Sequence, residues 1–175
     1  MPALKEISET LIRENITRAI ADVFKTMLGR EVELCTETQA NPDWPPIPSQ
    51  QGDPSPQVVG TVGFIGEVNG LIYISLPVSL ARVCTSHLLG MTEAEVDEVG
   101  DEVINDAIGE ITNMTVGSFK NGLCDAGYPC KLTIPSILRG SNFCVEPISS
   151  AERFIYRFKC GEQRVVTDIL LKGGD

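Results

Sequence analysis

Three polar residues, Asp106, Glu110 and Asn113, have a spacing that places them together on one side of a helix. They lie in the segment 100–123, and because an α-helix turns by about 100° per residue, positions i, i+4 and i+7 fall within a narrow sector. We call these three residues the polar wedge. Two carboxylates and an amide side by side can hold a cation, and the amide can also orient a water molecule. The sequence therefore predicts a polar site on the exposed face of this helix.

The opposite side of the helix is predicted to pack on a core, because its residues are mainly apolar: Ile104, Ala107, Ile108, Ile111, Thr115 and Phe119. A polar face opposite a core is often only solvated, and that interpretation stays open. Two features favour a partner instead. Thr112 and Asn113 are poor helix formers in a mid-helix position. Gly109 and Gly117 lie on or beside the wedge, each costing roughly 0.5–1 kcal/mol relative to Ala, and they would let another backbone come close.

Length and composition predict one globular domain, residues 1–175, with a proline-rich loop at 36–57. Hydrophobic residues make up 42% of the chain and charged residues 22%, as in ordinary folded domains. The net charge of −10 argues against binding to nucleic acid or to an anionic membrane, because binding to either requires clustered Lys and Arg on the protein. No apolar run is long enough to span a bilayer, and the N-terminus has no signal-peptide pattern. We therefore expect a soluble, cytoplasmic protein without membrane insertion.

The cysteines and the histidine argue against two common kinds of site. The six cysteines are dispersed without a C-x-x-C pair, and His87 is the only histidine, so the spacing of a zinc site is missing. A nucleophilic triad has no support either, because there is no second histidine and no nucleophile signature. We expect the cysteines to be core thiols rather than disulfides, and His87 to be structural.

The hydrophobic pattern predicts an α+β fold. Besides the helix that carries the wedge, helices are expected at 3–29 and 77–89. Strands are expected at 31–35, 58–65, 71–76, 131–135, 143–147, 152–160 and 163–171. Turns at 66–70 and 161–162 make two of these pairs into hairpins. Trp44 is expected to pin the proline-rich loop onto the domain.

A faint internal repeat relates the two halves of the chain. Residues 16–29 align with residues 104–117 so that three apolar positions and a closing glycine coincide. In this alignment Arg18, Asp22 and Lys25 stand opposite the three residues of the polar wedge. We therefore expect two helix-plus-strands halves around a mixed or antiparallel sheet. The first helix lacks the amide and the first acid, so one site per chain is expected.

In these features the chain resembles the CheX/CheC/FliY family of bacterial chemotaxis phosphatases. The resemblance rests on the spacing Asp106-x3-Glu110-x2-Asn113 followed by Pro135, in the helix sequence INDAIGEITNMTVGSFKNGL. It covers most of residues 1–175 and is weakest across the proline-rich loop. A single motif helix is similar to CheX rather than to CheC, which carries two. The resemblance implies a CheC-like fold with the motif helix exposed, and a homodimer.

The resemblance also implies a substrate, the phosphorylated aspartate of a CheY-type response regulator. Asn113 would position the attacking water, and Glu110 would pair with a lysine at the regulator's active site. Asp106 would extend that contact, and Gly109 and Gly117 would leave room for the regulator's loops. Pro135 would belong to the same partner-binding surface. The chain would need no cofactor of its own, because the regulator would hold the Mg²⁺ and the phosphoryl group.

Two other functions stay open. A non-catalytic docking module with the same fold would bind a regulator or a flagellar component without changing the lifetime of the phosphate. The amide of Asn113 argues against it, because docking alone does not require an amide there. A self-contained metal-dependent hydrolase would use Asp106 and Glu110 as ligands, but two carboxylates without a histidine make a poor site. The sequence names neither the regulator nor the output of the pathway.

Overall fold

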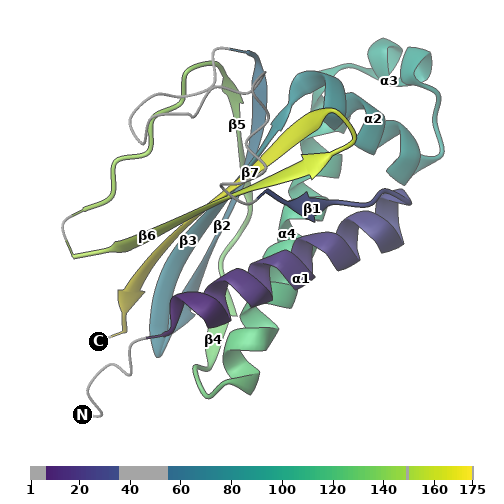
Figure 1. Ribbon diagram of the computed structural model, residues 1–175. Helices are drawn as coiled ribbons and strands as arrows, with labels where there is room; N and C mark the ends of the chain where they lie inside the picture. Colours follow the sequence, from purple (N-terminus) through teal and green to yellow (C-terminus); the bar gives the residue numbers. More distant parts are fainter. Residues whose placement is uncertain (1–6, 36–54, 149, 175) are drawn as a thin grey trace.

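Figure 1 shows the computed structural model of the chain, which describes residues 7–35, 55–148 and 150–174. Its elements are, in order, α1 (Glu9–Leu28), β1 (Glu33–Leu34), β2 (Gln57–Gly66), β3 (Val68–Pro77), α2 (Val78–Leu89), α3 (Glu93–Val99), α4 (Asp101–Asp125), β4 (Cys130–Leu132), β5 (Ser136–Gly140), β6 (Glu152–Cys160) and β7 (Gln163–Gly173). Helices α1, α2 and α4 lie on one side of an open sheet, in which all paired strands are antiparallel. The predicted α+β fold class is confirmed.

The two β-hairpins lie side by side at the centre of the sheet. The strand order is β1-β6-β7-β3-β2, and β4 and β5 both pair with the remaining edge of β2. Strand β1 follows α1 but pairs with β6 of the second half, whereas β4 and β5 follow α4 but pair with β2 of the first half. Each half thus contributes an edge strand to the other, an arrangement that supports the predicted duplication.

One hydrophobic core lies between the helices and the sheet. All the residues predicted on the apolar side of α4 are buried, and the ring of Phe119 lies 6.0 Å from that of Phe64 on β2. Thr112 joins this core, where its hydroxyl donates a hydrogen bond of 2.7 Å to the carbonyl of Ile108. A Cβ at Gly60 would lie 2.8 Å from the Cβ of Thr112. Thr112 therefore serves the close packing of α4 on β2, which explains its mid-helix position without a partner.

The structure corrects the prediction around β5. The predicted strand 143–147 is wrong, because the described residues of this segment form no strand, and the chain pairs with β2 through β5 instead. Pairing with an open sheet edge stabilises β5, whose sequence SILRG has only two apolar residues, Ile137 and Leu138, next to each other. Positive φ angles at Gly140 (151°) and Asn142 (57°) then turn the chain out of the sheet. The short helix α3 is a further element that the hydrophobic pattern does not predict.

The first helix begins later than predicted. Ser8 caps α1 by accepting a hydrogen bond of 3.1 Å from the backbone N–H of Leu11, and Glu9 starts the first turn. Gly29, with φ of 61°, ends the helix as predicted. The predicted start at residue 3 and most of the proline-rich loop, including Trp44, lie outside the described residues.

Candidate functional site

Helix α4 is fixed at its N-terminal end by a side chain from β5. Arg139 donates a hydrogen bond of 2.6 Å from Nε to the Asn105 side-chain oxygen, and its Nη1 lies 3.5 Å from a carboxylate oxygen of Asp101. Gly100, with φ of 88°, makes the sharp change of direction between α3 and α4. These contacts, together with the buried apolar side, set the rotation of α4 about its axis and so the direction in which its polar face points.

The structure places the three residues of the polar wedge on the outer face of α4. Asp106 and Glu110 are exposed, and Asn113 is partly exposed. Their side chains make no hydrogen bond or ion pair with any residue in the described part of the chain. Two carboxylates and an amide are thus presented to solvent on a rigid helix, with their hydrogen-bonding capacity available to a partner.

The two glycines near the wedge face the protein's own edge strands. A Cβ at Gly109 would lie 3.9 Å from Ile137 Cδ1 on β5, and a Cβ at Gly117 would lie 3.6 Å from Leu132 Cδ1 on β4. Both are ordinary van der Waals distances, so packing inside this chain does not require glycine at either position. The contacts show that α4 runs along the β4–β5 edge over these two turns.

A β-bulge interrupts this edge. The last pair of β4 is Leu132 with Phe64, and the first pair of β5 is Ser136 with Thr61. Three residues of the edge, 133–135, therefore lie opposite two residues of β2. An extra residue on one strand is the defining feature of a β-bulge, and bulges are common next to active sites, where they redirect a side chain.

The bulge explains how β4 and β5 both pack against the helix. Side chains alternate between the two faces of a strand, so Leu132 and Ile137, five positions apart, would face opposite sides of a regular strand. The extra residue restores the alternation, and both side chains contact α4. Since Asn113 lies midway between Gly109 and Gly117 on α4, the bulge between Leu132 and Ile137 lies beside Asn113.

Pro135 lies in this bulge and is exposed. Proline has no N–H to contribute to a strand ladder, so an unpaired bulge position suits it. The fold thus brings Pro135 next to the polar wedge, although the two are well separated in sequence. Ile134, the neighbouring bulge residue, is not among the predicted site residues. The sequence reads as a continuous strand at 131–135, and only the pairing register reveals the interruption.

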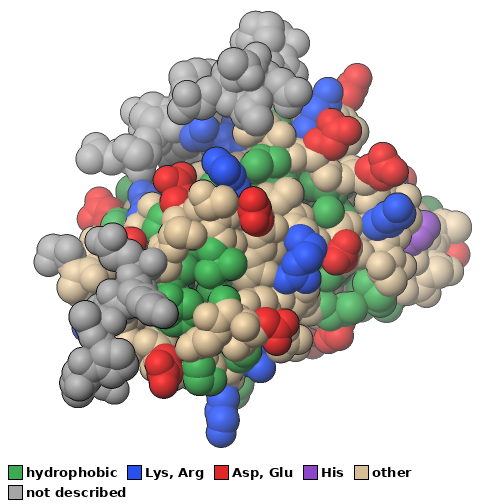
Figure 2. Space-filling model, turned by 60° about the horizontal axis from the view of Figure 1, so that its bottom comes forward, with side chains coloured by type: hydrophobic (Ala, Val, Ile, Leu, Met, Phe, Trp, Pro, Cys, Tyr) green, Lys and Arg blue, Asp and Glu red, His purple; other side chains and the backbone are tan. Residues whose placement is uncertain are grey.

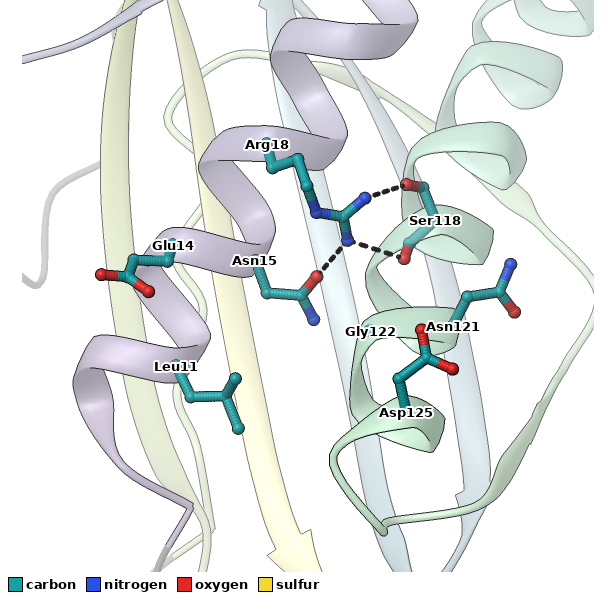
Figure 3. A pocket seen from close by; sticks show the side chains of 8 residues that line it. All are labelled: Leu11, Glu14, Asn15, Arg18, Ser118, Asn121, Gly122 and Asp125. Atoms are coloured by element: carbon teal, nitrogen blue, oxygen red, sulfur yellow. Dashed lines mark hydrogen bonds between the residues drawn. The ribbon is translucent and has the colours of Figure 1, made fainter.

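A groove of about 560 Å³ lies between α1 and α4, away from the bulge. Figure 3 shows the residues that line it: Leu11, Glu14, Asn15, Arg18, Ser118, Asn121, Gly122 and Asp125. Arg18 donates hydrogen bonds to Ser118 Oγ (3.2 Å), to the Ser118 carbonyl (3.3 Å) and to the Asn15 side-chain oxygen. Asn15 is buried and donates a bond of 2.7 Å to the Phe119 carbonyl. The polar groups of this groove hold the two helices together.

The sulfur and imidazole groups do not form a second candidate site. Within residues 7–35, 55–148 and 150–174, no group of three or more His, Cys, Asp or Glu residues is placed to hold a metal ion. The six cysteines are thiols that form no disulfide with one another, and three of them are buried. Burial raises the pKa of Cys84 to about 12 and that of Cys130 to about 11, so neither forms the reactive thiolate at neutral pH. Cys144 is exposed, unlike the predicted core thiols.

On the face shown in Figure 2, charged side chains of both signs are mixed rather than segregated. Lys and Arg side chains lie singly there, among acidic, apolar and uncharged ones. This differs from the clustered basic surface of a nucleic-acid-binding protein. No helix in the described part of the chain combines the length and apolarity needed to cross a membrane.

A family model described as the chemotaxis phosphatase CheX matches residues 58–159, more than half of the chain. The chain belongs to the CheX family. The matched region runs from β2 into β6 and contains α4 with the polar wedge and the bulge. Membership of this family agrees with the resemblance that the spacing of Asp106, Glu110 and Asn113 indicated.

Solved structures share the fold. CheX from Vibrio vulnificus is 22% identical over 92% of this chain and 96% of its own, with a TM-score of 0.72. The CheX–CheY–BeF3–Mg²⁺ complex from Borrelia burgdorferi matches with 22% identity over 92% of this chain and 97% of that chain, with a TM-score of 0.70. FliY from Thermotoga maritima gives 18% identity over 99% and 92%, with a TM-score of 0.60. Comparison with curated protein sequences gives no significant match.

Proposed function

We propose that this protein is a phosphatase that hydrolyses the phosphorylated aspartate of a CheY-type response regulator. Membership of the CheX family supports a role of this kind in chemotaxis signalling. The structure of a CheX family member in complex with CheY supports a regulator as the partner. The observation that carries the proposal is the polar wedge of α4, whose carboxylates and amide have no partner among the described residues.

The reaction needs a positioned water more than it needs a reactive side chain. Water attacks phosphorus in line with the bond to the aspartyl oxygen, that bond breaks, and the products are inorganic phosphate and a free carboxylate. Catalysis of such transfers is mostly positioning and charge stabilisation. The neutral amide of Asn113 can accept a hydrogen bond from the water without repelling the phosphoryl oxygens. Its fixed place on α4, beside the bulge, suits this role.

The remaining wedge residues are proposed to bind the partner. Glu110 lies one turn from Asn113, and its exposed carboxylate would pair with a lysine of the regulator and fix the docking register. Asp106 would extend this contact toward the start of α4. Gly109 and Gly117, which packing inside the chain does not require, would allow the regulator's loops to approach the helix. Pro135 would close the site on the bulge side.

The proposal assigns no cofactor to this chain, because the regulator would hold the Mg²⁺ that accompanies the phosphoryl group. We infer a cytoplasmic location, where a response regulator and its phosphatase would meet. The homodimer that the resemblance implies stays a prediction.

The experiment that tests the proposal is the decay of phosphate on a CheY-type regulator from the same organism, with and without this protein. The wild-type protein should accelerate the decay. Asn113→Ala should lose about 10²–10³ of that acceleration, by analogy with the removal of one well-aimed donor or acceptor in other enzymes. Asn121→Ala is the matched control, because Asn121 is an exposed asparagine on the same helix that faces the groove instead.

The outcomes separate the two leading functions. An Asn113→Ala protein as active as the wild type would refute the water-positioning role. Binding to the regulator without faster decay, in the wild type, would indicate a docking module rather than a phosphatase.

A further inference from the structure

Ile134 has the largest exposed fraction, 87%, among the large hydrophobic side chains that the structure describes. A single exposed hydrophobic residue needs no explanation by itself, and Ile148, at 65%, is a case of that kind. What distinguishes Ile134 is its position in the bulge, next to the polar wedge.

The backbone on both sides of Ile134 is held in place. Thr133 donates its N–H to the Gly63 carbonyl at 2.8 Å, and its hydroxyl accepts a bond of 2.9 Å from the Gly63 N–H. On the other side, the ring of Pro135 restricts φ, and Ser136 begins the pairing of β5 with β2. Ile134 is therefore held at a defined point outside the sheet, rather than carried on a long loop.

Ile134 lies in the bulge beside Asn113, and Asn113 is the member of the polar wedge closest to the C-terminal end of α4. The bulge runs beside Asn113 on the β4–β5 side of α4, while Glu110 and Asp106 project from the outer face of the helix. A partner that covers Asn113 closely enough to bring a phosphoryl group to it would also cover Ile134. An apolar side chain that becomes buried at the centre of an interface contributes strongly to affinity.

We propose that Ile134 is an apolar anchor that packs into an apolar patch on the regulator, beside its phosphorylated aspartate. This inference rests on the proposed function in one respect, that the occupant of the site is a CheY-type regulator. Ile134 adjoins the polar wedge, where the regulator is proposed to bind, and this position favours the regulator over a second copy of this chain. An anionic membrane is disfavoured by the two carboxylates on the same surface. The anchor sets how tightly the regulator binds, and Asn113 sets how fast the bound phosphate is lost.

The test is the affinity for a regulator held in its active form by beryllofluoride and Mg²⁺, which reports docking without hydrolysis. Ile134→Ala should weaken binding by about tenfold or more, because most of a buried side chain is lost. Ile148→Ala is the matched control, with the same residue type exposed outside the bulge, and should leave the affinity unchanged. Thermal unfolding should be the same for all three proteins, since neither side chain is buried.

In phosphate-decay assays, Ile134→Ala should raise KM and leave kcat unchanged, which is the pattern of a contact made equally in the ground state and the transition state. Equal affinities for the wild type and Ile134→Ala would overturn the anchor, and so would an equal loss in Ile148→Ala. An Ile134→Ala change that reduces only self-association would overturn it in favour of a contact between copies. If the wild type binds the regulator through Ile134 but does not accelerate phosphate loss, the anchor stands and the phosphatase proposal fails.

Discussion

Helices α1 and α4 occupy corresponding places in the two halves of the molecule, but their polar sides are used differently. In the repeat alignment Arg18 stands at the position of Asp106, and it donates hydrogen bonds to Ser118 on α4 and to Asn15 on its own helix. The polar wedge of α4 makes no such bonds within the described residues. At this position α1 uses its polar side chain to hold the two helices together, whereas α4 keeps the corresponding carboxylate of Asp106 available.

The edge strands that follow the two helices also differ, in length and in regularity. Strand β1, which follows α1, contributes two paired residues, Glu33 and Leu34, to the edge at β6. The edge that follows α4 is longer and contains the bulge at residues 133–135. The proposed site thus has two parts, a polar helix face and a bulged edge beside it, and only the α4 half of the molecule has both. Duplication provided two scaffolds, and the proposed site was built on one.

Neutralising one carboxylate on each helix should give the largest difference between α1 and α4. Glu110→Gln removes the charge at nearly constant shape and should weaken binding of the regulator by about 1.5–3 kcal/mol, roughly tenfold to more than a hundredfold, if Glu110 pairs with a lysine. Asp22→Asn, an exposed carboxylate at the corresponding position of α1, should change binding by no more than about twofold. Calorimetric titration at two salt concentrations measures both. Equal effects of the two variants would contradict the division of roles between the helices.

The glycines of α4 allow the second comparison, between the groove side and the bulge side of one helix. A Cβ at Gly122 would overlap Asn15 Oδ1 and lie 2.6 Å from Asn15 Cγ, so Gly122→Ala should destabilise the fold by about 1–3 kcal/mol. Gly109→Ala meets only Ile137, at 3.9 Å, and should raise stability by about 0.5–1 kcal/mol through helix propensity. Urea unfolding measures both.

A separate binding measurement tests why Gly109 is glycine. If Gly109 gives room to the regulator, Gly109→Ala should weaken regulator binding while the protein becomes more stable. Unchanged binding in that variant would show that the partner does not approach the helix at this position.

Much of the fold could be predicted from the sequence, because its periodic patterns are strong. The apolar side of α4 is buried as predicted, and β6 and β7 form the predicted hairpin. The failure at 143–147 has a physical cause, since strand formation there depends on which segment reaches the open edge of β2. Residues 136–140 reach it first, and the turn at Gly140 takes the chain out of the sheet.

Only the part of the candidate site that lies on one helix could be predicted from the sequence. The helical spacing of Asp106, Glu110 and Asn113 can be read directly from the sequence, because all three lie on one helix. The place of Pro135 came from the family resemblance, and no local pattern could show that Ile134 would be exposed beside Asn113. A bulge depends on the register between two strands distant in sequence, which local propensity does not encode.

The last prediction concerns an effect that should be absent. Asp22→Glu together with Lys25→Asn recreates the acid and the amide on α1, at exposed positions that the repeat alignment assigns to Glu110 and Asn113. Placed in an Asn113→Ala background, this pair should leave phosphate decay at the level of Asn113→Ala alone. The reason is that Arg18 stays engaged with Ser118 at the neighbouring turn, and the described residues after α1 supply only the short β1 at the corresponding edge. Restored activity would show that two side chains on a helix suffice, and that the bulged edge is not part of the site.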